Sequence, residues 1–110
     1  MKTVYRLVAV LIVLLGVIHV SLAPVFRGRL DLAGMWFLSG GLMLIFLGLL
    51  NLARSGSPVA LARWAAFVAD VLGLAFLVGL VPLAPLRQNP QVTVAIALTS
   101  AAAVFSLRRL

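Results

Sequence analysis

The chain has 110 residues, of which 65% are hydrophobic, and its mean hydropathy is +1.25. Nine Lys and Arg face only two acidic residues, which gives a net charge of +7. A soluble domain of this size cannot cover so much apolar surface, so the composition excludes one. The cations flank apolar runs, as membrane topology requires, and we expect no nucleic-acid partner because that would need a basic soluble face.

The apolar runs predict an all-α integral membrane protein, a bundle of four transmembrane helices in one domain over residues 1–110. A helix needs roughly 20 apolar residues to cross a bilayer. The expected helices cover residues 4–23, 32–52, 58–81 and 90–107. Proline, glycine and N-capping residues mark the boundaries. In chain order these are Pro24, Asp31, Gly56, Ser57, Pro58, Pro82, Asn89 and Pro90.

The distribution of cations predicts the orientation. One side of the predicted bundle carries Lys2, Arg6, Arg54, Arg63, Arg108 and Arg109, and the other carries Arg27, Arg29 and Arg87. The positive-inside rule then places both termini in the cytoplasm, and we expect a bacterial inner membrane with the lipid bilayer as partner. The first run also has the layout of a signal peptide ending in "SLA", but Pro24 after that site and the length of the run favour a retained helix.

Small and polar residues mark helix–helix contacts in a bilayer, because lipid competes with leucine for apolar surface. Each predicted helix carries one such face. The faces are Arg6, Ala9, Val13, Gly16, His19 and Ala23; Gly41, Leu44, Gly48 and Asn51; Ala62, Ala66, Ala69, Asp70 and Gly73; and Ala95, Thr99, Ala102 and Ser106. The polar side chains fall on these faces, which predicts a bundle interior holding Arg6, His19, Asn51, Asp70 and Thr99.

Asp70 is the strongest functional signal, since a charge inside a membrane costs about 2.5–3.5 kcal/mol on insertion scales. Its expected partner is Arg6, with Arg63 as second choice, and Asn51 as a hydrogen-bond donor. Asp70, Arg6, Asn51 and Thr99 therefore form the candidate intramembrane polar site. A paired Asp70 would be structural, and an unpaired one would indicate proton or ion coupling; the sequence leaves both open.

His19 is the only histidine and lies near the predicted outer interface. With Trp36 and Ser39 it forms a candidate outer-leaflet site, in which we expect a hydrogen bond from His19 to Ser39 or to a loop carbonyl. Binding of a ligand or proton is the alternative. A single His and two Asp cannot build a metal cluster or a haem site with two histidines, and no catalytic motif is present, so we expect no metal, no cofactor and no enzyme activity.

Two resemblances follow from these patterns. "YRLVAVLIVLLGVIHVSLAPVF" followed by "GMWFLSGGLMLIFLGLLNL" resembles DoxX-like and related small four-span bacterial proteins: an entry arginine, Gly then His, a proline exit and a tryptophan-led second helix. This resemblance covers about half the chain and implies a fold rather than an activity. The chain is also similar in length and span number to small multidrug resistance transporters, but it lacks the first-helix glutamate of that family.

Two functions are compatible with the sequence. The first is a non-catalytic bundle that acts through self-association, as a homo-oligomer, or as an accessory to a larger membrane complex. The second is a small-molecule or proton-coupled transporter, or a ligand-binding protein, with Asp70 as its intramembrane coupling group. A weaker third interpretation is a subunit acting on a lipid or quinone near His19.

Overall fold

The computed structural model describes residues 2–27, 32–82 and 90–108, with the side chains of residues 23–34 left out. The described residues form four helices and no strand: α1 (Lys2–Arg27), α2 (Leu32–Ser55), α3 (Ala60–Leu80) and α4 (Pro90–Leu107). Each contains a stretch of 18 or 21 residues that is long and apolar enough to cross a membrane. The predicted all-α, four-span architecture is confirmed, and it is that of a small multi-pass membrane protein.

The first helix ends later than predicted. α1 passes through Pro24 and continues to Arg27. A proline removes one backbone donor, but its fixed φ is itself helical, so the chain after it is free to remain in the helix. In an apolar surrounding, a continued helix also keeps the remaining backbone groups bonded to one another.

The third helix begins later than predicted. α3 starts at Ala60, preceded by Val59 in an extended conformation. The Ser57 hydroxyl accepts a hydrogen bond from the Val59 N–H at 3.2 Å, so Ser57 and Pro58 belong to the turn instead of the helix. α4 does begin at Pro90, as expected, whereas the predicted capping residues Asp31 and Asn89 lie outside the described part of the chain.

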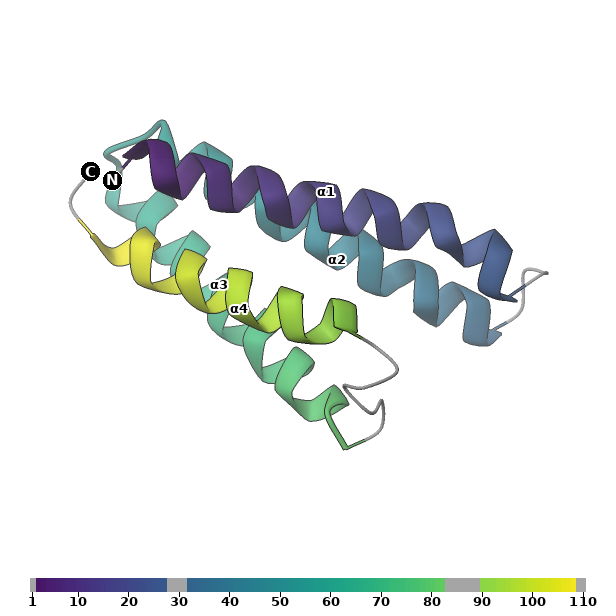
Figure 1. Ribbon diagram of the computed structural model, residues 1–110. Helices are drawn as coiled ribbons and strands as arrows, with labels where there is room; N and C mark the ends of the chain where they lie inside the picture. The colour runs from purple at the N-terminus through teal and green to yellow at the C-terminus, as the bar shows by residue number, and fades with distance from the viewer. Residues whose placement is uncertain (1, 28–31, 83–89, 109–110) are drawn as a thin grey trace.

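The helices form two hairpins, α1–α2 and α3–α4 (Figure 1). α1 packs on α2 and α4, and α3 packs on α4 and α2. The start of α1 and the end of α4 lie at the same end of the bundle, which we call the terminal end (Figure 1). The hairpins are close together at the terminal end and diverge toward the other end, where α1 leads into α2.

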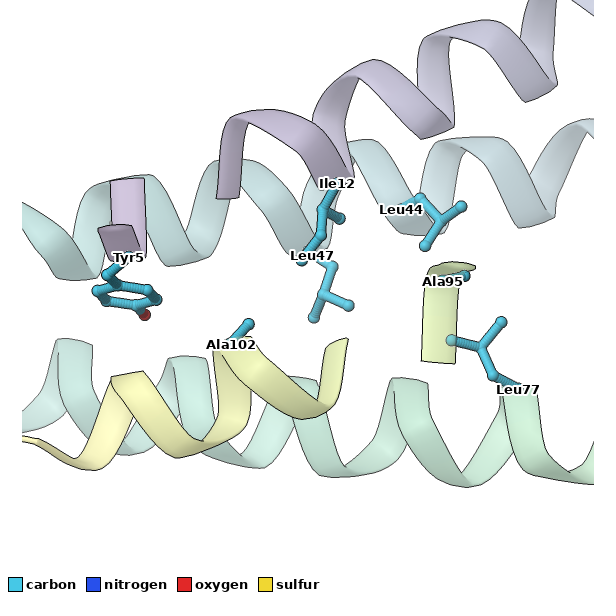
Figure 2. Close-up of a cluster of buried hydrophobic side chains, with 7 residues drawn as sticks. All are labelled: Tyr5, Ile12, Leu44, Leu47, Leu77, Ala95 and Ala102. Atoms are coloured by element: carbon cyan, nitrogen blue, oxygen red, sulfur yellow. The ribbon is translucent and has the colours of Figure 1, made fainter. Parts of the chain in front are cut away.

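An apolar core joins the two hairpins (Figure 2). It consists of Tyr5, Ile12, Leu44, Leu47, Leu77, Ala95 and Ala102. Many large apolar side chains point outward instead; Leu61 is 77% exposed. An outward-facing apolar surface of this kind is expected where lipid, and not water, surrounds the helices.

Glycines allow α1 and α2 to approach backbone to backbone. A Cβ added at Gly16 would lie 2.7 Å from the Gly41 carbonyl oxygen and 2.9 Å from the Ile45 nitrogen. One added at Gly48 would lie 2.9 Å from both the Ala9 oxygen and the Val13 nitrogen. Any larger residue at either position must therefore separate the two helices.

The predicted packing faces are largely confirmed. The faces expected for the second and fourth helices are buried along their whole length: Gly41, Leu44, Gly48 and Asn51 in α2, and Ala95, Thr99, Ala102 and Ser106 in α4. In α3, Ala66, Asp70 and Gly73 are buried, while Ala62 and Ala69 are half-buried. In α1, Ala9 and Gly16 are buried and Val13 and His19 are half-buried, whereas Arg6 is exposed; the side chain of Ala23 lies outside the described part of the chain.

Candidate functional site

Three polar side chains from three helices form a hydrogen-bonded chain in the bundle interior. The Tyr5 hydroxyl donates to Asn51 Oδ1 at 2.6 Å. Asn51 Nδ2 donates to Asp70 Oδ1 at 2.6 Å and to its own helix at the Leu47 carbonyl, at 2.9 Å. Tyr5, Asn51 and Asp70 are all 0% exposed. This Tyr5–Asn51–Asp70 chain links α1, α2 and α3 through side chains alone.

Two further oxygens in this region have no hydrogen-bond partner among the residues that the structure describes. They are Asp70 Oδ2 and Thr99 Oγ1, and both residues are fully buried. Asp70 lies 10 residues after the start of α3 at Ala60, and Thr99 lies 8 residues before the end of α4 at Leu107. Because the two helices form an antiparallel hairpin, these positions fall at a similar depth, about 12–15 Å along the helices. Two of the three buried side-chain polar atoms without partners among the described residues thus lie at one level of the bundle.

That level is the middle of the apolar span. Asp70 is the central residue of the 21-residue span Ala60–Leu80. The free-energy cost of an ionised side chain is highest at the centre of a span. Structures retain such residues mainly where they have a partner or a function, so this carboxyl group is the centre of the candidate site.

The expected partner of Asp70 is absent from this level. Arg6 is exposed, and its Nε donates to the Ser55 hydroxyl at 3.4 Å. The prediction that Arg6 lies in the interior beside Asp70 is therefore wrong. Tyr5 immediately precedes Arg6 and is buried, and successive helical residues are rotated by about 100°. A helix that turns Tyr5 inward necessarily turns Arg6 outward.

The second expected partner, Arg63, also lies away from the carboxylate. It is half-buried in the first turn of α3, about two turns from Asp70, and its guanidinium lies over the Trp64 ring at 5.5 Å. Its Nε has no hydrogen-bond partner. Asn51 is thus the donor to Asp70, as the sequence suggested, and neither arginine is.

Tyr5 was not among the predicted site residues. Its signal in the sequence is the spacing of Tyr5, Ala9, Ile12 and Gly16, which places these four residues on one helical face. All four are buried. The Tyr5 ring also stacks on Phe105 of α4, with centroids 6.0 Å apart, so one side chain contacts α2 and α4 together.

Arg54 is the other residue whose role the sequence did not reveal. It is 6% exposed, and it donates from Nε to the Ser106 carbonyl, from Nη1 to the Ser57 carbonyl and from Nη2 to the Arg108 carbonyl, each at 3.0 Å. The last carbonyls of a helix have no partners within it and carry partial negative charge. Arg54 therefore binds the end of α4 to the α2–α3 turn.

The outer-leaflet candidates do not form one site. His19 Nε2 donates to the Phe37 carbonyl oxygen at 2.8 Å, and the His19 and Phe37 rings stack with centroids 4.0 Å apart. Ser39 donates to the Trp36 carbonyl at 2.7 Å, and the Trp36 side chain is 70% exposed. The expected hydrogen bond from His19 to Ser39 or to a loop is thus replaced by one to a carbonyl of α2, and His19 joins α1 to α2.

The chemistry available in the described residues is narrow. No group of three His, Cys, Asp or Glu side chains that could hold a metal ion occurs among them. At the level of Asp70 the bundle offers the carboxyl group itself, the amide of Asn51 and the hydroxyl groups of Tyr5 and Thr99. Such a set can bind or release a proton, or hold water, within an otherwise apolar bundle.

Comparison of the chain with protein-family models, with curated proteins and with solved structures gave no match. The resemblances to DoxX-like proteins and to small multidrug resistance transporters therefore stay predictions.

Proposed function

We propose that this multi-pass membrane protein is a proton-coupled transporter or ligand-binding protein, with Asp70 as the group that carries the proton. The observation that carries the proposal is the state of the Asp70 carboxyl group. One oxygen accepts from Asn51, and the other is buried without a partner at the centre of a membrane span.

The physical argument concerns charge. An ionised carboxylate inside the bundle has only neutral partners here, namely the Asn51 amide and, through it, the Tyr5 hydroxyl. Neutral hydrogen bonds offset only part of the cost of removing a charge from water. A proton on Oδ2 removes the charge while leaving the Asn51 bond to Oδ1 intact. The site is therefore built to hold a proton, and a change in water access on either side would release it.

Infrared difference spectroscopy tests the proton directly. A protonated carboxyl group has its own C=O stretch, and we expect one buried carboxyl band to titrate with pH in the detergent-solubilised protein. Asp70→Asn should remove that band, because it replaces the carboxyl group. The fold should be kept, since the amide has the same size and still offers an oxygen acceptor to Asn51. Asp31→Asn, which replaces the other acidic residue of the chain, is the matched control and should keep it.

A band that persists in Asp70→Asn, or the absence of any titrating band, would contradict the proposal. Coupling is then measured in liposomes loaded with a pH-sensitive dye, with candidate substrates added outside. The wild-type protein should move protons when the correct substrate is present, and Asp70→Asn should bind that substrate without moving protons.

A second function is favoured by a different observation. The Tyr5–Asn51–Asp70 chain joins three helices, which suits a non-catalytic bundle that associates with itself or with a larger membrane complex. In that case the polar residues only stabilise the fold. Asp70→Asn would then leave every functional assay unchanged, and crosslinking in native membranes would recover the protein as an oligomer or with a partner.

A further inference from the structure

Cations gather at the terminal end of the bundle without acidic partners. Lys2, Arg6 and Arg108 are exposed there, and Arg63 is half-buried. Among the described residues, Asp70 is the only acidic one, and it lies at the centre of its span. No carboxylate within the described chain neutralises this end.

One buried cation at this end already supplies the hydrogen bonds that hold the helix ends together. Buried Arg54 binds the final carbonyls of α4 and the α2–α3 turn. That one cation holds the helix ends in place, so the charges of the four outer cations remain available. Of these, Arg6 donates a hydrogen bond to the neutral Ser55 hydroxyl, and within the described part of the chain no acidic side chain accompanies it.

Arg63 lies beside a tryptophan at this end of the bundle. Its side chain is half-buried, and its guanidinium lies over the Trp64 ring at 5.5 Å. Trp64 itself is 50% exposed. Tryptophan beside a guanidinium is typical of the membrane interface, where a ring sits at headgroup depth and a cation reaches phosphate oxygen.

Apolar surface adjoins these cations. Val4 in α1, Leu61 in α3 and Leu107 in α4 are exposed within a turn or two of them. A ligand for the whole surface must have a negative headgroup and acyl chains below it, which excludes free phosphate and favours a phospholipid. We propose that Lys2, Arg6, Arg63 and Arg108 form a binding surface for anionic phospholipid headgroups.

The two tryptophans allow a test within one molecule, because Trp64 lies beside the proposed surface and Trp36 lies near the opposite end of α2. Trp36→Phe leaves Trp64 as the only tryptophan, and Trp64→Phe leaves Trp36. Both variants are placed in phosphatidylcholine vesicles containing either brominated phosphatidylglycerol or brominated phosphatidylcholine, which quench nearby tryptophan. Trp64 should be quenched more by the brominated phosphatidylglycerol than by the brominated phosphatidylcholine, and this preference should be larger for Trp64 than for Trp36.

Charge variants connect this preference to the named cations. In the Trp36→Phe background, Arg6→Gln, Arg63→Gln and Arg108→Gln should each lower the phosphatidylglycerol preference by about fivefold at low salt. The matching Arg→Lys variants keep the charge and should keep most of the preference. Circular dichroism of each variant in zwitterionic micelles verifies that the helices are retained.

Three outcomes would overturn the proposal. The first is equal quenching of Trp64 by the two lipids, and the second is a triple Arg→Gln variant that keeps the full preference. The third is loss of the preference when inorganic phosphate is added at constant ionic strength, which would assign the site to the free anion.

Discussion

Asn51 Nδ2 donates a hydrogen bond to Asp70 Oδ1 at 2.6 Å, and Oδ1 of the same amide accepts one from the Tyr5 hydroxyl, also at 2.6 Å. An amide is one of the few side chains that can donate and accept at once without carrying charge. The position therefore allows α1 and α3 to be joined through α2. Removing Asn51 would leave a tyrosine hydroxyl and a carboxyl group buried without partners.

Replacing Asn51 by Leu should lower the free energy of unfolding in detergent by about 1–3 kcal/mol, because it leaves buried polar groups unsatisfied. A double-mutant cycle with Asp70→Leu isolates the Asn51–Asp70 bond. We expect a coupling energy of about 0.6–1.7 kcal/mol, which runs from the average to the maximum measured for hydrogen bonds between membrane helices. Denaturant unfolding followed by circular dichroism provides the values, and strictly additive effects would show that the bond contributes nothing.

Tyr5→Phe removes one hydroxyl and keeps the ring that stacks on Phe105. The expected loss is about 1 kcal/mol, the net value of one hydrogen bond. Tyr5→Ala also removes the ring from the core and should cost about 3–5 kcal/mol. Equal losses for the two variants in the same unfolding assay would mean that the hydroxyl, and not the ring, supplies the stability.

Arg54→Gln should destabilise the terminal end by at least about 2 kcal/mol, because it removes charge-assisted bonds to three carbonyl groups. Arg108→Gln is the matched control, since the hydrogen bond from Arg54 goes to the backbone oxygen of Arg108, which this substitution keeps. Amide hydrogen exchange should show faster exchange in the last turn of α4 for Arg54→Gln alone. Similar exchange in the two variants would refute the role given to Arg54.

Gly16→Ala should separate α1 from α2, because the new methyl group would lie 2.7 Å from the Gly41 carbonyl oxygen. Overpacking of this kind costs about 1–3 kcal/mol. Gly79→Ala provides the control, since nothing lies within 4 Å of a Cβ at that position. The separation is measured as the distance between spin labels on α1 and α2. An unchanged distance and an unchanged free energy of unfolding in Gly16→Ala would show that a methyl group fits between the two helices.

The number of helices, the start of α4 and most packing faces follow from local patterns in the sequence. Pro90 starts a helix because its φ and missing donor suit that position. The faces of α2 and α4 were predictable because small and polar residues recur at helical spacing.

The partners within the bundle were not predictable in the same way. Tyr5 and Arg6 are neighbours, and which of them faces Asn51 depends on the rotation of α1 against α2. That rotation is set by the backbone contact at Gly16 and Gly48, which involves residues far apart in the sequence. The contacts of Arg54 depend likewise on where the end of α4 lies, which no local pattern near Arg54 encodes.

The Asn51–Asp70 bond also has a consequence for how the protein is made. Synthesis and membrane insertion proceed from the N-terminus. The α1–α2 hairpin, which contains the glycine contact and the Tyr5–Asn51 hydrogen bond, is therefore synthesised before α3. Asp70, the acidic residue at the centre of α3, then follows its hydrogen-bond donor Asn51 into the bilayer. The order of the helices along the chain thus lowers the barrier to inserting the acid.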